Sequence, residues 1–238
     1  MSENYYEKTL NANRLYKVYQ TKYERIQSYL DAEISFVKDR LCGTENILEL
    51  GAGYGRIMKE IAPYCKSIVG IDISENTVEF GESYLRDAPN TKLMVMDAHK
   101  IGPDTFEMPF EIVLCMQNAL SAMKVEPFSF VAKMMRLVVP GERMFISTYS
   151  AKFWRHRLDW FHEQAQKGLL GKIIPEQTKD GVIVCEGGFR GETHTPEQLS
   201  EIGDSSGCPY EIHEVDESSL FLVITRPNRT TNSYSCLN

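Results

Sequence analysis

The sequence predicts an α/β fold in which a mostly parallel sheet is covered by helices on both faces. Apolar runs of strand length alternate along the chain with amphipathic, helix-like stretches, and the runs lack polar alternation. Strands that are buried on both faces have this continuous apolar pattern. A glycine-rich turn, Gly51-Ala-Gly-Tyr-Gly55, also follows the first run directly. The 238 residues suffice for one such domain with a modest elaboration.

The first forty residues have a helical pattern. Leu15, Val18 and Tyr19 share one face, and further apolar residues continue at three-to-four spacing: Ile26, Leu30, Ile34, Val37 and Leu41. The segment CGTEN, at residues 42–46, ends the pattern. Residues 1–42 are therefore predicted to form N-terminal helices that precede the main domain, residues 43–227.

The main domain then alternates strands and helices. Its predicted strands are Ile47–Leu50, Ser67–Ile71, Leu93–Met96, Ile112–Met116 and Met144–Ser147. The helices between them are predicted at Arg56–Tyr64, Asn76–Leu85 and Pro127–Leu137. A Pro-Gly turn within Val138–Arg143 is expected to end the last of these helices.

The rhythm changes after Thr148. A helix is predicted at 152–168, followed by a hairpin around Asp180-Gly181, so that residues about 151–194 form a helix-hairpin insertion. Thr195 is an expected helix cap with proline in the next position. Two closing strands are predicted at the end of the domain, and residues 228–238 are expected to be a flexible tail. The closing strands are Tyr210–Val215 and Leu220–Thr225.

Composition restricts the class of protein. The formal net charge is −7 and no run of Lys and Arg exceeds two residues, which argues against a nucleic-acid partner. No segment approaches the roughly 20 apolar residues that span a bilayer, and the polar N-terminus is unlike a signal peptide. The six cysteines are scattered without a Cys-x-x-Cys pair, so reduced thiols, a cytoplasmic location and no metal site are expected.

The glycine turn is the strongest functional signal. In α/β sheets, a glycine-rich turn after the first strand binds nucleotides. The third glycine stands one position too early for the dinucleotide pattern G-x-G-x-x-G, because Arg56 occupies that place. Asp72 ends the second strand, where a carboxylate can accept from ribose hydroxyls, and Asp97 ends the third, where it can accept from an adenine amine. Glu49 suits a cationic ligand better than a pyrophosphate. Together these residues describe an adenosine pocket.

Four motifs, in order and spacing, resemble those of class I S-adenosylmethionine-dependent methyltransferases: ILELGAGYGR, VGIDIS, VMDA and MMRLVVPGERMFIS. The resemblance covers about residues 47–147. It implies a Rossmann-like sheet of seven strands, the last of which is antiparallel to the others. One departure is Glu142, where family members often have a second glycine.

The resemblance also implies the cofactor S-adenosyl-L-methionine, with S-adenosyl-L-homocysteine as product. The glycines would pass under its methionine portion, Asp72 would hold the ribose, and Asp97 would meet the adenine. Carried over by position, the predicted cofactor-binding residues are Glu49, Gly51, Ala52, Gly53, Gly55, Arg56, Asp72, Ile73, Asp97, Ala98, Met116 and Gln117.

The catalytic signal is fainter, because methyl transfer depends mainly on alignment of the reacting groups. Weak catalytic candidates are Gln117, Asn118, His156, Arg190 and His194, and predicted substrate-side residues are Tyr6, Asn118, Tyr149, Trp154 and Arg190. The helix that carries Trp154 and His156 also has an ordinary core-and-surface interpretation, and Arg190 also has an ordinary partner in Glu192. Five tyrosines within residues 4–23 suggest an N-terminal lid that brings Tyr5 or Tyr6 to the cofactor.

The functional prediction is a methyltransferase for a small-molecule acceptor that is enclosed from water. A protein or tRNA acceptor is the first alternative. A non-catalytic module that binds the cofactor is another, and an NAD-dependent oxidoreductase is disfavoured by the early third glycine and by Glu49. The identity of the acceptor, the general base and the oligomeric state do not follow from the sequence.

Overall fold

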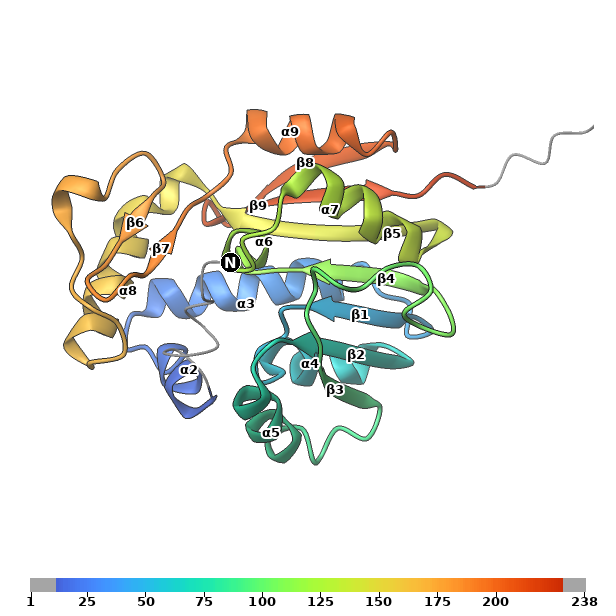
Figure 1. Ribbon diagram of the computed structural model, residues 1–238, viewed down its shortest axis with the longest axis horizontal. Helices are drawn as coiled ribbons and strands as arrows, with labels where there is room; N and C mark the ends of the chain where they lie inside the picture. Colours follow the sequence, from blue (N-terminus) through green and yellow to red (C-terminus); the bar gives the residue numbers. More distant parts are fainter. Residues whose placement is uncertain (1–11, 229–238) are drawn as a thin grey trace, which may run out of the picture.

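The computed structural model describes residues 12–228, and a seven-stranded sheet forms its centre (Figure 1). The strand order is β3-β2-β1-β4-β5-β9-β8, and β9 runs antiparallel to both of its neighbours. This arrangement confirms the predicted mostly parallel sheet with an antiparallel last strand. The strands are β1 (Asn46–Leu50), β2 (Ser67–Asp72), β3 (Thr91–Val95), β4 (Phe110–Cys115), β5 (Val138–Tyr149), β8 (Tyr210–Val215) and β9 (Ser219–Thr225).

Helices cover both faces of the sheet. They are α3 (Glu24–Lys38), α4 (Arg56–Ile61), α5 (Glu75–Tyr84), α6 (Ala119–Ala122), α7 (Pro127–Met134) and α9 (Pro196–Ser205). One apolar cluster joins α3, α4 and α5 to the sheet, and a second joins α7 and α9 to its other face. Neighbouring residues of β4 alternate between the clusters: Ile112 and Leu114 join the first, Val113 and Cys115 the second. Burial on both faces explains the continuous apolar runs of the sequence.

The prediction of a Pro-Gly turn at residues 138–143 was wrong. These residues belong to β5, which is much longer than the predicted Met144–Ser147. Gly141 has φ +90°, and the register against β4 shifts between Phe110 and Ile112, as it does at a β-bulge. The bulge is held by Arg226, which extends the pairing of β9: Gly141 N donates to Arg226 O at 2.7 Å.

The two helices of the predicted N-terminal lid, α2 (Ala12–Val18) and α3, pack against different parts of the molecule. The second half of α3, with Ile34 and Val37, belongs to the sheet cluster, so this helix is part of the main domain. Among the described residues of the predicted lid, α2 and the adjoining Tyr19 lie over the carboxyl edge of the sheet. Tyr5 and Tyr6 lie outside the described residues, as does the predicted tail from residue 229 onward.

The insertion after β5 contains α8 (Trp154–Gln166) and a short hairpin of β6 (Ile183–Val184) and β7 (Arg190–Gly191). The predicted turn at Asp180-Gly181 forms, with Val182 N donating to Lys179 O at 2.8 Å. The paired strands, however, enclose a second turn at Gly187-Gly188, where both glycines have positive φ. The predicted cap of α9 is confirmed, because the Thr195 side chain accepts from Gln198 N.

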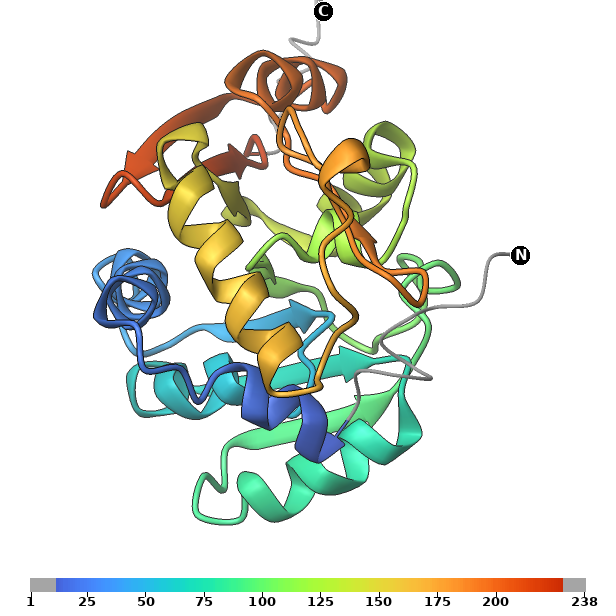
Figure 2. The same cartoon turned by 90° about the vertical axis from the view of Figure 1, so that its left-hand side faces the viewer.

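The insertion and α2 pack together as one unit, which we call the cap: α2, α8 and the β6–β7 hairpin (Figure 2). Trp160 Nε1 of α8 donates to Val18 O at 3.1 Å, and Arg14 donates to the carbonyls of residues 168 and 169. A third apolar cluster joins α2, α8, the hairpin and the first half of α3. Within residues 12–228, no helix is both long and apolar enough to cross a membrane.

Candidate functional site

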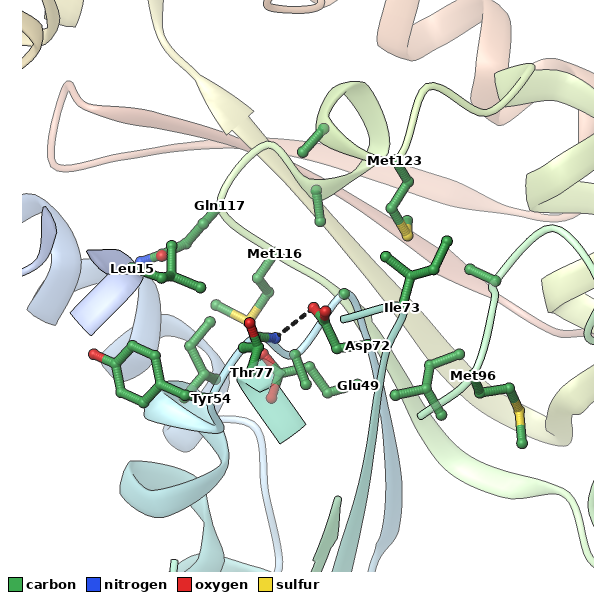
Figure 3. A pocket seen from close by; sticks show the side chains of 18 of the residues that line it. Leu15, Glu49, Tyr54, Asp72, Ile73, Thr77, Met96, Met116, Gln117 and Met123 are labelled. Carbon is green, nitrogen blue, oxygen red and sulfur yellow. Dashed lines mark hydrogen bonds between the residues drawn. The ribbon is translucent and has the colours of Figure 1, made fainter. Parts of the chain in front are cut away.

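A cavity of about 670 Å³ opens at the carboxyl edge of β1, β2 and β4, beneath α2. This edge is where open α/β sheets bind ligands. The view in Figure 3 places Leu15 and Gln117 at one end of the cavity and Met96 and Met123 at the other. All of the predicted cofactor-binding residues except Gly55 line it: Glu49, Gly51, Ala52, Gly53, Arg56, Asp72, Ile73, Asp97, Ala98, Met116 and Gln117.

The glycine turn shapes the floor of this cavity. Gly51 and Gly53 have φ of +67° and +56°, in the left-handed region that favours glycine. A Cβ on Gly53 would lie 3.0 Å from Leu15 Cδ2, so α2 rests closely on the turn. Gly55 also has positive φ, but a Cβ there would lie 2.6 Å from Leu85 Cδ1. Gly55 therefore serves the packing of α4 and lies outside the cavity lining, unlike the role expected from the sequence.

Asp72 ties the end of β2 to the glycine turn. Its Oδ2 accepts from Gly53 N at 2.9 Å (Figure 3). Its Oδ1 accepts from Ser74 N, also at 2.9 Å. Burial raises the pKa of this carboxyl, and the backbone donors, among them Ser74 and Gly53, offset part of the rise. An ionised carboxylate has about four acceptor positions. Asp72 can therefore hold the turn and still accept from a hydroxyl group in the cavity.

Three side chains of the lining carry buried polar atoms without a hydrogen-bond partner: Glu49 Oε2, Arg56 Nη2 and Gln117 Nε2. They come from β1, the start of α4 and the exit of β4. Buried polar atoms are normally paired, so their gathering around one cavity indicates a polar ligand. A carboxylate, a guanidinium and an amide together suit a ligand that carries both a positive and a negative group.

The electrostatics of Glu49 support this interpretation. The residue is buried at the end of β1. Burial raises its pKa to about 8, the positive charge of Arg56 lowers it, and the negative charge of Asp72 raises it. An ammonium group placed against Glu49 would favour the ionised form and satisfy its free oxygen.

Arg56 is held by an aromatic ring that the sequence did not assign to the site. Its guanidinium lies 4.7 Å from the centre of the Tyr19 ring, just after α2. Burial raises the pKa of Tyr19 to about 12, and Arg56 lowers it. Leu15 and Tyr19 both line the cavity. In the sequence, the four-residue spacing of Leu15 and Tyr19 predicted only that they share a buried helix face. It did not show that this face covers a cavity.

The opposite end of the cavity has an apolar wall and an acidic corner. Asp97 Oδ1 accepts from His99 N at 3.0 Å, and Lys100 Nζ lies 3.4 Å from Asp97 Oδ2. Ile73, Met96 and Ala98 supply apolar surface beside it. The sequence did not predict several other residues of the cavity lining: Thr77, His99, Lys100, Met123 and Lys124.

Gln117 and Asn118, which are adjacent in the chain, differ in function. Both have positive φ, at +53° and +62°. Both polar atoms of the Asn118 amide have partners, because Nδ2 donates to Glu192 O and Oδ1 accepts from Thr148 Oγ1, each at 2.8 Å. Asn118 therefore fastens the end of the insertion to β5, and it does not line the cavity. Gln117 keeps its side chain in the cavity wall.

The other predicted substrate-side residues do not line this cavity. Tyr149 packs between Tyr29 and Phe153, and the Arg157 guanidinium lies 4.5 Å from its ring centre. Trp154 belongs to the cap, with its indole near Arg157. Tyr6 lies outside the described residues.

Three catalytic candidates also lie elsewhere. Arg190 is exposed and pairs with Glu192 at 3.3 Å, and with His194 it borders a separate hollow of about 600 Å³ beside α6. Burial lowers the pKa of His194. His156 packs against the Phe153 ring. Of the weak catalytic candidates, Gln117 alone lies in the main cavity lining.

The known proteins that this chain resembles include methyltransferases. A family model described as a methyltransferase domain matches residues 47–141. The ubiquinone biosynthesis O-methyltransferase of Aromatoleum aromaticum is 27% identical over 142 residues, which are 58% of this chain and 56% of that protein. The chain spans between 21% and 56% of the length of the curated relatives that it matches.

Solved structures share the fold. A protein of Pyrococcus horikoshii aligns with TM-score 0.65 and 19% identity over 89% of this chain and 98% of its own. An N-methyltransferase of Bradyrhizobium japonicum, solved with S-adenosyl-L-homocysteine, aligns with TM-score 0.59 and 13% identity over 95% of this chain and 100% of its own.

Proposed function

We propose that the chain is a class I S-adenosylmethionine-dependent methyltransferase, which transfers the methyl group of S-adenosyl-L-methionine to a small-molecule acceptor. The observation that carries the proposal is the set of three unpartnered buried atoms, on Glu49, Arg56 and Gln117, around one cavity. The amino-acid end of the cofactor is a zwitterion, and these groups complement both of its charges.

Each end of the cavity has a distinct part in holding the cofactor. At the amino-acid end, Glu49 would accept from the ammonium group and Arg56 would donate to the carboxylate. Asp72 would accept from the ribose hydroxyls with the capacity left by its two backbone donors. At the far end, Ile73 and Ala98 would pack on the adenine and Asp97 would accept from its amine.

The cofactor supplies the reactive methyl group, on a positively charged sulfur. The protein has to orient the acceptor and exclude water, and alignment of this kind can be worth about 7–11 kcal/mol. Met116 and Gln117, at the exit of β4, form the wall beside the amino-acid end. Leu15 and Tyr19 close the cavity from the side of the cap. These residues are therefore proposed to shape the space in which the acceptor meets the cofactor.

A small acceptor is supported by the enclosure of the site and by the charge of the chain. α2 covers the glycine turn, and α2 packs in one apolar cluster with α8 and the β6–β7 hairpin. The net charge of −7 disfavours an RNA acceptor, because RNA binding requires positive charge along the phosphates. We also propose a cytoplasmic location, supported by the five free cysteines among residues 12–228.

The proposal is tested by calorimetric titration of the purified chain with S-adenosyl-L-homocysteine and, in parallel, with NAD. Binding of the first without the second is expected. Turnover of S-adenosyl-L-methionine is then measured against a panel of metabolites, with a peptide mixture and bulk tRNA as the competing acceptor classes. Transfer to a metabolite supports the proposal. Methyl transfer only to peptide or tRNA would mean that the acceptor is a protein or tRNA and not a small molecule. Binding of the cofactor without methyl transfer to any of these acceptors would favour a non-catalytic module.

A further inference from the structure

Two consecutive hydroxyl side chains, Ser147 and Thr148, are buried near the end of β5. They are 0% and 2% exposed. Side chains at successive positions of a strand point to opposite faces of the sheet. In agreement, their partners on β9, Phe221 and Leu220, belong to different apolar clusters. A hydroxyl that is buried in an apolar layer is costly unless it is hydrogen-bonded, so each of the two requires a partner.

Ser147 holds the backbone of the turn between β4 and α6. The parallel pairing of β4 with β5 ends at Cys115 and Ile146. Beyond this point the Gln117 N–H donates to Ser147 Oγ at 2.7 Å, and the Asn118 N–H donates to Ser147 O at 3.0 Å. The side chain of Ser147 therefore supplies an acceptor where the strand pairing no longer does. An alanine there would leave the Gln117 N–H without this partner.

Thr148 holds a side chain of the same turn from the other face of the sheet. Its Oγ1 donates to Asn118 Oδ1 at 2.8 Å and accepts from His194 N at 3.2 Å. Gln117 and Asn118 have φ of +53° and +62°. Non-glycine residues in this region are strained and persist only where their surroundings fix them. The two hydroxyls, one on each face of the sheet, provide that fixation.

The turn determines where one wall of the cavity stands. Gln117 lines the cavity, as does α6 through Ala119 and Ala122. Gln117 Nε2 is also one of the unpartnered buried atoms of the cavity lining. A side chain that binds a ligand has to be held within about 0.5 Å of its productive position. Neither Ser147 nor Thr148 lines the cavity, so their effect on a ligand has to pass through this turn.

We infer that Ser147 and Thr148 are positioning residues, whose hydroxyls hold the left-handed turn so that the Gln117 amide meets the amino-acid end of the cofactor. This inference rests on the proposed function, because it assigns Gln117 to that end of the ligand. It predicts that loss of either hydroxyl weakens recognition of the amino-acid group and leaves recognition of the adenosine intact. A purely structural role would instead weaken the binding of every ligand of the cavity alike.

The test measures two affinities by calorimetry, for S-adenosyl-L-homocysteine and for 5′-methylthioadenosine, which lacks the amino-acid group. Thr148→Val removes the hydroxyl and keeps the shape of the side chain. It should lower the ratio of the two affinities about tenfold, which corresponds to 1.4 kcal/mol. Thr148→Ser keeps the hydroxyl and loses a buried methyl group, so it should lower Tm and keep the ratio within about twofold of the wild-type value.

Ser147→Ala provides a second variant and the test remains decisive if Thr148→Val does not fold. It should lower the ratio about tenfold in the wild-type chain and less than about twofold in Gln117→Ala, because the amide that it positions is then absent. Ser219→Ala is the matched control. Ser219 is also 0% exposed, but its hydroxyl donates to Glu33 Oε1 at 2.9 Å and makes no printed contact with the turn. The control should lower Tm and leave the ratio unchanged.

The outcomes separate the inference from the proposed function. If the wild-type chain prefers S-adenosyl-L-homocysteine and a folded Thr148→Val or Ser147→Ala chain keeps that preference, the inference is wrong while the proposed function stands. An equal effect of Ser147→Ala with and without the Gln117 side chain also overturns it, because the hydroxyl would then act on another part of the molecule. If the wild-type chain binds neither ligand, the proposed function fails and the inference fails with it.

Discussion

The cofactor cavity and the cap are built by different kinds of interaction. The cavity is formed by the ends of β1, β2 and β4 and by the glycine turn. These strands are joined by the regular parallel pairing of β1 with β2 and with β4. The cap joins α2 to α8 and the β6–β7 hairpin through one apolar cluster and a few long-range hydrogen bonds. Residues 18 and 160, for example, lie 142 positions apart and meet only in the folded chain.

The difference has a physical consequence. The cavity depends on backbone conformation and on buried charges, which admit few substitutions. The cap depends on apolar packing, which tolerates changes that conserve volume. Damage to the cavity should therefore affect ligand binding first, whereas damage to the cap should affect stability first.

The largest effect on binding is expected for Gly53→Val. A β-branched side chain is strained at φ +56°, and its Cβ would lie 3.0 Å from Leu15 Cδ2. The variant should lose measurable binding of S-adenosyl-L-homocysteine by calorimetry. Gly43→Val is the matched control, because Gly43 has φ +88° but no heavy atom within 4 Å of the added Cβ. The control should be destabilised by backbone strain and still bind. Equal binding by both variants would mean that ligand and α2 do not meet at Gly53.

Trp160→Ala tests the cap. Removal of a buried tryptophan costs about 3–5 kcal/mol of unfolding free energy, and the indole N–H to Val18 is lost as well. Denaturant unfolding should show a large loss of stability. Trp160→Phe keeps most of the packing and should lose much less. If Trp160→Ala abolished ligand binding without a change in stability, α8 would contact the ligand directly and the distinction between the two regions would be wrong.

Asp72→Ala tests the cavity with a moderate effect. It removes the acceptor for two backbone N–H groups and for the proposed ribose hydroxyls. Affinity for S-adenosyl-L-methionine should fall by about 1–3 kcal/mol, as expected for lost hydrogen bonds to a charged group. Asp72→Asn keeps one acceptor oxygen, and its affinity should lie between those of the wild-type chain and Asp72→Ala. Unchanged affinity in Asp72→Ala would remove the ribose from this position.

Arg190→Ala should have the smallest effect. The residue is exposed, and its ion pair with Glu192 is of the surface type that contributes about 0–1 kcal/mol. Stability and cofactor affinity should both match the wild-type chain. Once an acceptor has been identified, a specific rise in its KM for this variant would restore Arg190 as a substrate residue and move the acceptor toward the hollow beside α6.

The sequence predicted the cavity well because its signals are local. The apolar runs placed the strands, and the strand ends placed Glu49, Asp72 and Asp97 at one edge. The cap was predicted as separate pieces, since no pattern shows that a short helix near residue 15 will pack on a helix near residue 160. For the same reason the sequence did not show that Arg190 and His194, which it assigned to the acceptor site, border a hollow beside α6.

Glu33 had a signal that sequence analysis missed. It stands three residues after Leu30 and four before Val37, and therefore lies on the apolar stripe of α3. A carboxylate on a buried stripe requires a partner or a function, which is a reason to examine it. Tyr19 had only its place on such a stripe, which does not distinguish a cavity wall from core.

The central claim is that Glu49, Arg56 and Gln117 recognise a zwitterionic amino-acid group. It is tested most directly by calorimetry with S-adenosyl-L-homocysteine and with 5′-methylthioadenosine, which has the same adenosine and thioether but no amino-acid group. Two charge-assisted hydrogen bonds at about 1.5–3 kcal/mol each predict that the first ligand binds roughly 100-fold tighter or more. The preference should shrink in Glu49→Gln and in Arg56→Met. Equal affinity of the wild-type chain for the two ligands would contradict the account.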